Sequence, residues 1–185
     1  MLKIISATFA LSVFAGGVDA QVMDHANMDH AGHMAAMADA QRQAEVSGRG
    51  KDVMPFSLAA TTHIFAKTAE GGVQQVVVKN PADAVQEKMI RRHLQELREH
   101  FLKGNFSGPS HIHGQDMPGL ADLKAAKPGQ IAIAYKDIEG GAQLTYNTSQ
   151  ANLVAALHKW FGAQVSDHGK DAMEGHVSQI SIRNK

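Results

Sequence analysis

The chain has 185 residues, with 18 basic and 18 acidic side chains, 11 histidines and no cysteine. The balanced charge provides no strong positive field for nucleic acid or anionic lipid, so we expect neither as a partner. The lack of cysteine excludes disulfides, thiolate zinc sites and cysteine-centred blue-copper sites, and it leaves histidine as the main source of metal-binding chemistry.

Residues 1–20 have the features of a cleavable secretion signal. Lys3 provides a basic start, an apolar run follows to about residue 17, and residues 18–20 form a small-residue cleavage site. The run is shorter than the roughly 20 residues that a membrane-spanning helix needs, and no later segment is as apolar. We therefore expect a periplasmic protein, not inserted in a membrane, whose mature chain forms one domain of ordinary size.

Residues 21–52 are predicted to form a flexible arm. The segment contains no aromatic residue and few branched aliphatic residues, so it cannot bury enough apolar surface to order itself. Residues 34–46 nevertheless favour a helix because alanine, methionine, glutamine and arginine are good helix formers. Such a helix would end at Gly48-Arg49-Gly50.

The arm concentrates imidazoles and thioethers in twelve residues, namely Met23, His25, Met28, His30, His33 and Met34. Imidazole suits late first-row divalent metals and thioether favours Cu(I), so a mixed set without cysteine favours copper over zinc. If the arm became helical, one face would gather His30, His33, Met34 and Met37. Flexible capture is equally compatible with the pattern, and a solvated tail of accidental composition is the alternative.

The domain is expected over residues 53–169, with a carboxyl-terminal tail at 170–185. Its first part, residues 56–78, is rich in β-branched residues and is interrupted by Glu70-Gly71-Gly72, which predicts a hairpin. Asn80-Pro81-Ala82-Asp83 then predicts the start of a long helix.

That helix is expected to end at Lys103-Gly104, before a loop at 105–119 and a short turn at 120–126. A second hairpin is predicted over 130–147, and a second helix over 149–165.

Two hairpins and two helices predict an α+β fold. Four strands can form one antiparallel sheet that carries both helices on a single face, as a two-layer sandwich. Internal duplication is indicated by six aligned pairs, namely Ile64 with Ile133, Lys67 with Lys136, Glu70 with Glu139, Gly71 with Gly140, Gly72 with Gly141 and Gln74 with Gln143. Coincidence between two similar turns is the alternative to duplication.

A second candidate metal site lies in the loop that contains His111 and His113. An extended His-X-His segment places both rings on one face, so the pair can bind one ion. Met117 or Asp116 would complete the set if Gly114 turns the loop back. The alternative is a surface loop whose histidines cap backbone groups.

The remaining histidines are assigned from their helical or strand positions. His93 lies on the flank of the long helix, where His63 from the first hairpin or a ring of the His111 loop can meet it. A hydrogen-bonded histidine at the edge of the core is the alternative for His63, His93 and His158. His100 is predicted to belong to a solvated face, and Asp167-His168-Gly169 with residues 173–176 to form a second loose collecting segment.

The Met-Asp-His triplets at 23–25 and 28–30, followed by His33-Met34, resemble the Met/His-rich segments of bacterial periplasmic copper-resistance proteins. The resemblance is confined to residues 23–37. It implies that the methionines and histidines of this segment bind copper in the periplasm.

The leading hypothesis is a periplasmic protein without enzymatic activity that buffers, sequesters or transfers Cu(I) or Cu(II) in copper tolerance. Its partners would be copper ions and another periplasmic copper-handling protein. One alternative is a secreted metal-dependent enzyme whose ion is held among His63, His93, His111 and His113. The other is a haem-binding module with His93 or His158 as axial ligand.

Overall fold

The computed structural model of the chain describes the backbone of residues 25–176 and the side chains of residues 32–176. The predicted signal at 1–20, Met23 and the end of the predicted tail lie outside the described residues. Among residues 25–176, no helix is long and apolar enough to cross a membrane.

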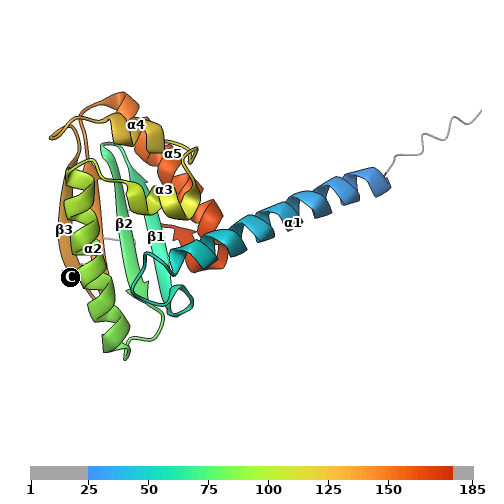
Figure 1. Cartoon of the computed structure of the whole chain (residues 1–185), viewed down its shortest axis with the longest axis horizontal. Helices are drawn as coiled ribbons and strands as arrows, with labels where there is room; N and C mark the ends of the chain where they lie inside the picture. Colours follow the sequence, from blue (N-terminus) through green and yellow to red (C-terminus); the bar gives the residue numbers. More distant parts are fainter. Residues whose placement is uncertain (1–24, 177–185) are drawn as a thin grey trace, which may run out of the picture.

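One twisted sheet forms the first layer of the domain (Figure 1). Its strands are β1 Thr61–Thr68, β2 Gly71–Val78, β3 Ala132–Ile138, β4 Gly141–Asn147 and β5 Ala172–Glu174, arranged in the order β3-β4-β2-β1-β5. The helices are α1 His25–Gly50, α2 Ala84–Leu102, α3 Ser107–His113, α4 Leu120–Ala125 and α5 Ala151–His168, with short 3₁₀ turns η1 Leu58–Ala60 and η2 Gly169–Asp171.

The α+β class is confirmed, but the prediction of a four-stranded antiparallel sheet is wrong. The described part of the sheet has five strands and is mixed, because β5 pairs in parallel with β1 from His63 opposite Ala172 to Phe65 opposite Glu174. β5 has three residues. A strand this short has no readable alternation of polar and apolar residues, so the sequence assigned it to the tail.

The helices α2 and α5 cover the same face of the sheet, as expected for two layers. Their inner residues share one hydrophobic cluster with the sheet, which includes Ile90, Leu94 and Phe101 of α2, Leu157, Trp160 and Phe161 of α5, and Phe65, Val76, Leu144 and Tyr146 of the strands. α2 begins one turn later than the predicted cap, because the Asp83 carboxylate accepts a hydrogen bond from the Gln86 amide at 3.1 Å.

The two hairpins are present, but the alignment that suggested duplication is wrong by one residue. The sequence alignment pairs residues that are 69 positions apart, such as Ile64 and Ile133. In the structure, Gly71 and Gly141 occupy equivalent places directly after their turns, and they are 70 positions apart. A shift of one residue exchanges the two faces of a strand. Ile133 accordingly packs in the main cluster, while Ile64 lies on the other face with Val77 and Ile138.

The described part of the predicted arm is helical. α1 contains the helix expected at 34–46 and ends at the expected Gly-Arg-Gly segment. Its last turns contact α3 and α5, where Val46 is fully buried and Arg49 donates a hydrogen bond to the Ile112 carbonyl at 2.7 Å. The preceding part of α1 projects from the domain (Figure 1).

Close packing of β4 against β2 predicts a steric requirement for glycine at position 141. A Cβ atom there would overlap the Val76 carbonyl oxygen and lie 3.1 Å from the Val77 Cα. We expect Gly141→Ala to lower the free energy of unfolding by about 3 kcal/mol, measured by urea denaturation.

The matched control is Gly48→Ala in α1, where no atom lies within 4 Å of the added Cβ. Its free energy of unfolding should stay within about 1 kcal/mol of the original, in the stabilising direction. Equal effects of the two substitutions would contradict this packing.

Candidate functional site

Four histidines from four different elements line one small cavity of about 50 Å³. They are His63 of β1, His93 of α2, His113 of α3 and His168 at the end of α5. The remaining wall includes Phe65, Leu94, Trp160 and Gln164, and is mostly apolar. The fold therefore brings together imidazoles that are up to 105 residues apart, from His63 to His168.

His168 lies at the centre of this group. Its ring centroid is 5.1 Å from that of His63, with the two planes 6° apart, and 5.0 Å from that of His113, with the planes at 82°. His93 is linked to this group through Phe56, because the Phe56 ring centroid is 5.5 Å from that of His93 and 5.9 Å from that of His63. His63, His168 and His113 therefore form a continuous row of rings.

A buried carboxylate orients the last ring in the row. His113 Nδ1 lies 2.8 Å from Asp167 Oδ2, and both side chains are almost fully buried. Arg42 of α1 holds the same carboxylate through two hydrogen bonds of 2.6 and 2.7 Å and also donates to the His113 carbonyl at 3.0 Å. The arrangement leaves His113 Nε2 free of the carboxylate, as in histidines that bind metals or carry protons.

Burial determines the charge of the group. It is the main cause that lowers the pKa of His63, His93 and His168, and neighbouring imidazoles lower the pKa of His63 and His168 further, the latter to about 4. Burial alone would raise the pKa of Asp167, but hydrogen bonds from His113 and Arg42 outweigh it and lower that pKa. At neutral pH, His63 and His168 are therefore neutral beside an ionised carboxylate.

One fully buried ring nitrogen in the group lacks a hydrogen-bond partner. Within the described residues, three buried side-chain polar atoms are unpaired, and one of them is His63 Nδ1. An unpaired buried polar atom costs roughly 1–3 kcal/mol, so such atoms are rare and often mark ligand sites. His63 thus contributes a nitrogen that no protein group uses.

The predicted His-X-His pair does not have the expected geometry. Both histidines lie on α3, where two residues correspond to roughly 200° of rotation, so the extended arrangement is wrong. His111 is exposed and contacts Asp52 at 3.2 Å, whereas His113 points into the cavity. The proposed completing ligand Met117 is buried in the main hydrophobic cluster, and Asp116 is exposed.

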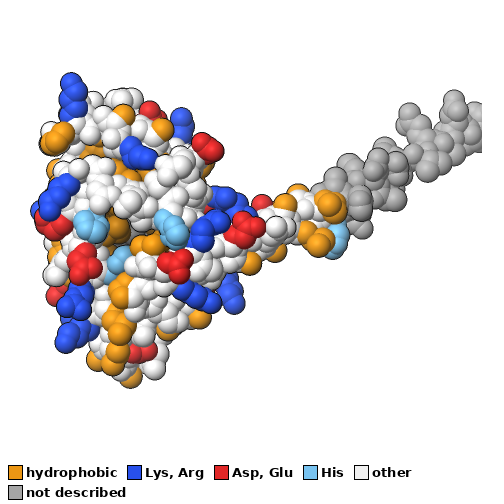
Figure 2. Space-filling view, viewed as in Figure 1, with side chains coloured by type: hydrophobic (Ala, Val, Ile, Leu, Met, Phe, Trp, Pro, Cys, Tyr) orange, Lys and Arg blue, Asp and Glu red, His pale blue; other side chains and the backbone are white. Residues whose placement is uncertain are grey.

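The arm residues remain separate from this group. His33, Met34 and Met37 are exposed on α1, and Figure 2 shows hydrophobic and histidine side chains on its projecting part. The side chains of Met23, His25, Met28 and His30 lie outside the described residues. Across residues 32–176, no three histidine or carboxylate side chains are already placed to hold a metal ion, so copper binding stays a prediction.

His158 and His100 have ordinary structural surroundings. His158 Nε2 lies 2.9 Å from the carbonyls of Thr68 and Gly71, which confirms the interpretation as a hydrogen-bonded histidine at the edge of the core. His100 is exposed in the last turn of α2, as expected.

The prediction that Asp167 and His168 belong to a loose collecting segment is wrong, because both are buried at the end of α5. The signal that identifies His168 is the inner face of the second helix, whose predicted residues end at Gln164. One further turn reaches His168, and α5 does continue to that residue rather than ending at 165. No local pattern identifies Arg42, because its partner is 125 residues away.

Comparisons with protein-family models, with curated proteins and with solved structures find no match to this chain. The function is therefore argued from the site itself.

The neutral imidazoles predict a loss of stability in mild acid. The folded-state pKa of His168, about 4, lies below the unfolded value of about 6.5, so the unfolded chain takes up the proton first as the pH falls. Stability should therefore decrease from about pH 6.5 towards pH 4, and His168 alone should account for about 2 kcal/mol between pH 7 and pH 5.

Urea unfolding of His168→Gln should show a correspondingly shallower pH dependence over this range. His100→Gln, which alters an exposed histidine, is the control and should leave the dependence unchanged. An unchanged slope in His168→Gln would exclude a neutral buried His168.

Proposed function

We propose that this protein is an exported copper-binding protein that buffers, sequesters or transfers copper in the periplasm. In this proposal the Met/His segment of the arm collects the ion, and His63, His113 and His168 form the ordered site. The observation that carries the proposal is the row of three buried imidazoles. Two of them, His63 and His168, are neutral at pH 7, and the third, His113, is oriented by the Asp167 carboxylate.

The separations within the row are suited to a shared ion. Two imidazoles that bind one metal at about 2.0–2.1 Å per nitrogen have ring centroids roughly 5 Å apart. The pairs His63–His168 and His113–His168 have centroids at 5.1 and 5.0 Å. The nearly parallel planes of the first pair require one ring to turn, and the adjoining cavity of about 50 Å³ provides space for that movement.

The charges around the row also favour a bound cation. Neutral imidazoles need not lose a proton before they bind a metal, so the buried rings can act as ligands down to mildly acidic pH. The Asp167 carboxylate accepts a hydrogen bond from His113 Nδ1, and this would make His113 Nε2 a better electron-pair donor to a metal ion. His63 Nδ1, which has no partner among the described residues, would gain one.

The arm and the row differ in the metal state that they would prefer. The row provides imidazole nitrogens, which suit Cu(II), whereas the methionines of residues 23–37 favour Cu(I). α1 connects the two, because it carries His33 and Met34 at one end and Arg42, which holds Asp167, nearer the other. The resemblance of residues 23–37 to Met/His-rich periplasmic copper-resistance proteins supports the same function.

A metal-dependent enzyme is the second candidate, because the His113–Asp167 pair has the arrangement of a general base and its orienting carboxylate. We favour binding over catalysis because the His113 side chain is only 2 % exposed and the cavity holds about 50 Å³. Catalytic pockets for organic substrates are normally several times larger. The same volume argues against haem, and His158 is engaged by two carbonyls.

The proposal predicts that the buried row holds one tight Cu(II). We expect the His63→Gln/His168→Gln variant of the mature protein to lose this ion, as measured by chelator competition and by the nitrogen splitting of the Cu(II) electron paramagnetic resonance spectrum. His100→Gln is the control, because His100 is exposed and distant from the cavity lining. Retention of the tight ion in the double variant would remove the row from the proposed function.

The arm should show a division of labour between the two oxidation states. Substituting Met23, Met28 and Met34 by Leu should weaken Cu(I) binding much more than Cu(II) binding, because the thioether is a softer ligand than imidazole and prefers Cu(I). Substituting His25, His30 and His33 by Ala should have the reverse bias. Competition titrations that find equal losses for both ions would contradict this assignment.

A further inference from the structure

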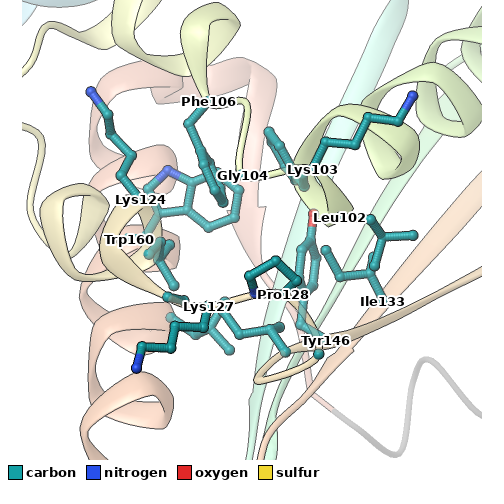
Figure 3. Close-up of a pocket in the computed structure, with 16 residues that line it drawn as sticks. Leu102, Lys103, Gly104, Phe106, Lys124, Lys127, Pro128, Ile133, Tyr146 and Trp160 are labelled. Carbon is teal, nitrogen blue, oxygen red and sulfur yellow. The ribbon is translucent and has the colours of Figure 1, made fainter.

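A second cavity, separate from the histidines, lies on the other side of Trp160. Its volume is about 250 Å³, and it is lined by the end of α2, the segment between α2 and α3, the end of α4 and residues 126–131 (Figure 3). The walls are aromatic and aliphatic, and they include Phe106, Tyr146, Trp160, Leu123, Ile131 and Ile133. We call this space the Trp160 pocket.

Three lysines surround the Trp160 pocket, and no acidic residue lines it. Lys103, Lys124 and Lys127 are exposed lining residues, and Figure 3 shows their side chains on different sides of the pocket, with the ammonium groups extending outward from it. Lys124 donates to the Gln115 side chain at 3.0 Å, and within residues 32–176 none of the three lysines forms an ion pair. A chain of zero formal net charge thus concentrates positive charge around one pocket whose walls include aromatic and aliphatic side chains.

The wall also contains a buried donor without an acceptor. Trp160 is 1 % exposed, and its indole Nε1 has no hydrogen-bond partner among the described residues. A buried indole N–H normally finds a partner. An acceptor atom of a bound molecule would supply one.

We propose that the Trp160 pocket binds a small organic carboxylate with an apolar body. The apolar part would pack against Phe106, the carboxylate would accept a hydrogen bond from the Trp160 indole N–H, and the positive charge of Lys103, Lys124 and Lys127 around the pocket would attract it. Cavities for drug-sized ligands measure roughly 300–1,000 Å³, so about 250 Å³ suits a smaller molecule. The positive edge would repel a metal cation, and the proposal does not depend on copper binding.

The test uses the chain's single tryptophan as the reporter. The metal-free mature protein is titrated with 3-phenylpropanoate, and with 3-phenylpropanamide as an uncharged molecule of the same shape, while Trp160 fluorescence is recorded. We expect a saturable change with the carboxylate, binding at least tenfold weaker for the amide, and weaker carboxylate binding as salt is added. No saturable change, or equal affinities for acid and amide, would overturn the proposal.

Two triple variants assign the charge effect to the edge of the pocket. Lys103→Gln/Lys124→Gln/Lys127→Gln should weaken 3-phenylpropanoate binding at least tenfold and should remove most of its salt dependence. The control, Lys51→Gln/Lys136→Gln/Lys159→Gln, removes the same charge from exposed lysines outside the pocket and should change affinity less than twofold. Equal weakening in both variants would overturn the proposal, whereas the copper titrations would be unaffected.

Discussion

The rest of the site depends on the hydrogen bonds and the ion pair of the Asp167 carboxylate. This carboxylate belongs to α5, accepts a hydrogen bond from His113 of α3, and is held in two places by Arg42 of α1. Three helices from distant parts of the chain are therefore joined by one buried anion. Because removing one partner of such a group leaves an uncompensated buried charge, the three helices are constrained to keep their present arrangement.

The same carboxylate separates the roles of the neighbouring imidazoles. His113 donates to Asp167 and so has a defined orientation, while His63 and His168 form no ion pair with a carboxylate among the described residues and stay neutral because they are buried. These two neutral rings are able to accept a cation without first losing protons. This is the physical basis for the proposal that the domain, and not the arm alone, binds a metal ion.

Trp160 and Phe101 form a common wall between the histidine cavity and the Trp160 pocket. The two spaces differ in character, since four imidazoles line one, whereas three lysines but no histidine or carboxylate line the other. Cations and carboxylates would therefore be directed to opposite sides of the same aromatic wall. A ligand on either side that moves the Trp160 ring would alter the space on the other.

The sequence by itself determined the local features of this protein: two hairpins marked by Glu-Gly turns, two long helices, and an α+β class with both helices on one face. These follow from short-range periodicity and turn chemistry, which neighbouring residues carry. Only the tertiary structure decided the parallel pairing of β5, the helical conformation that separates His111 from His113, and the meeting of His63, His113 and His168 around Asp167 and Arg42. These features arise from contacts between residues tens to more than a hundred positions apart, for which no local pattern exists.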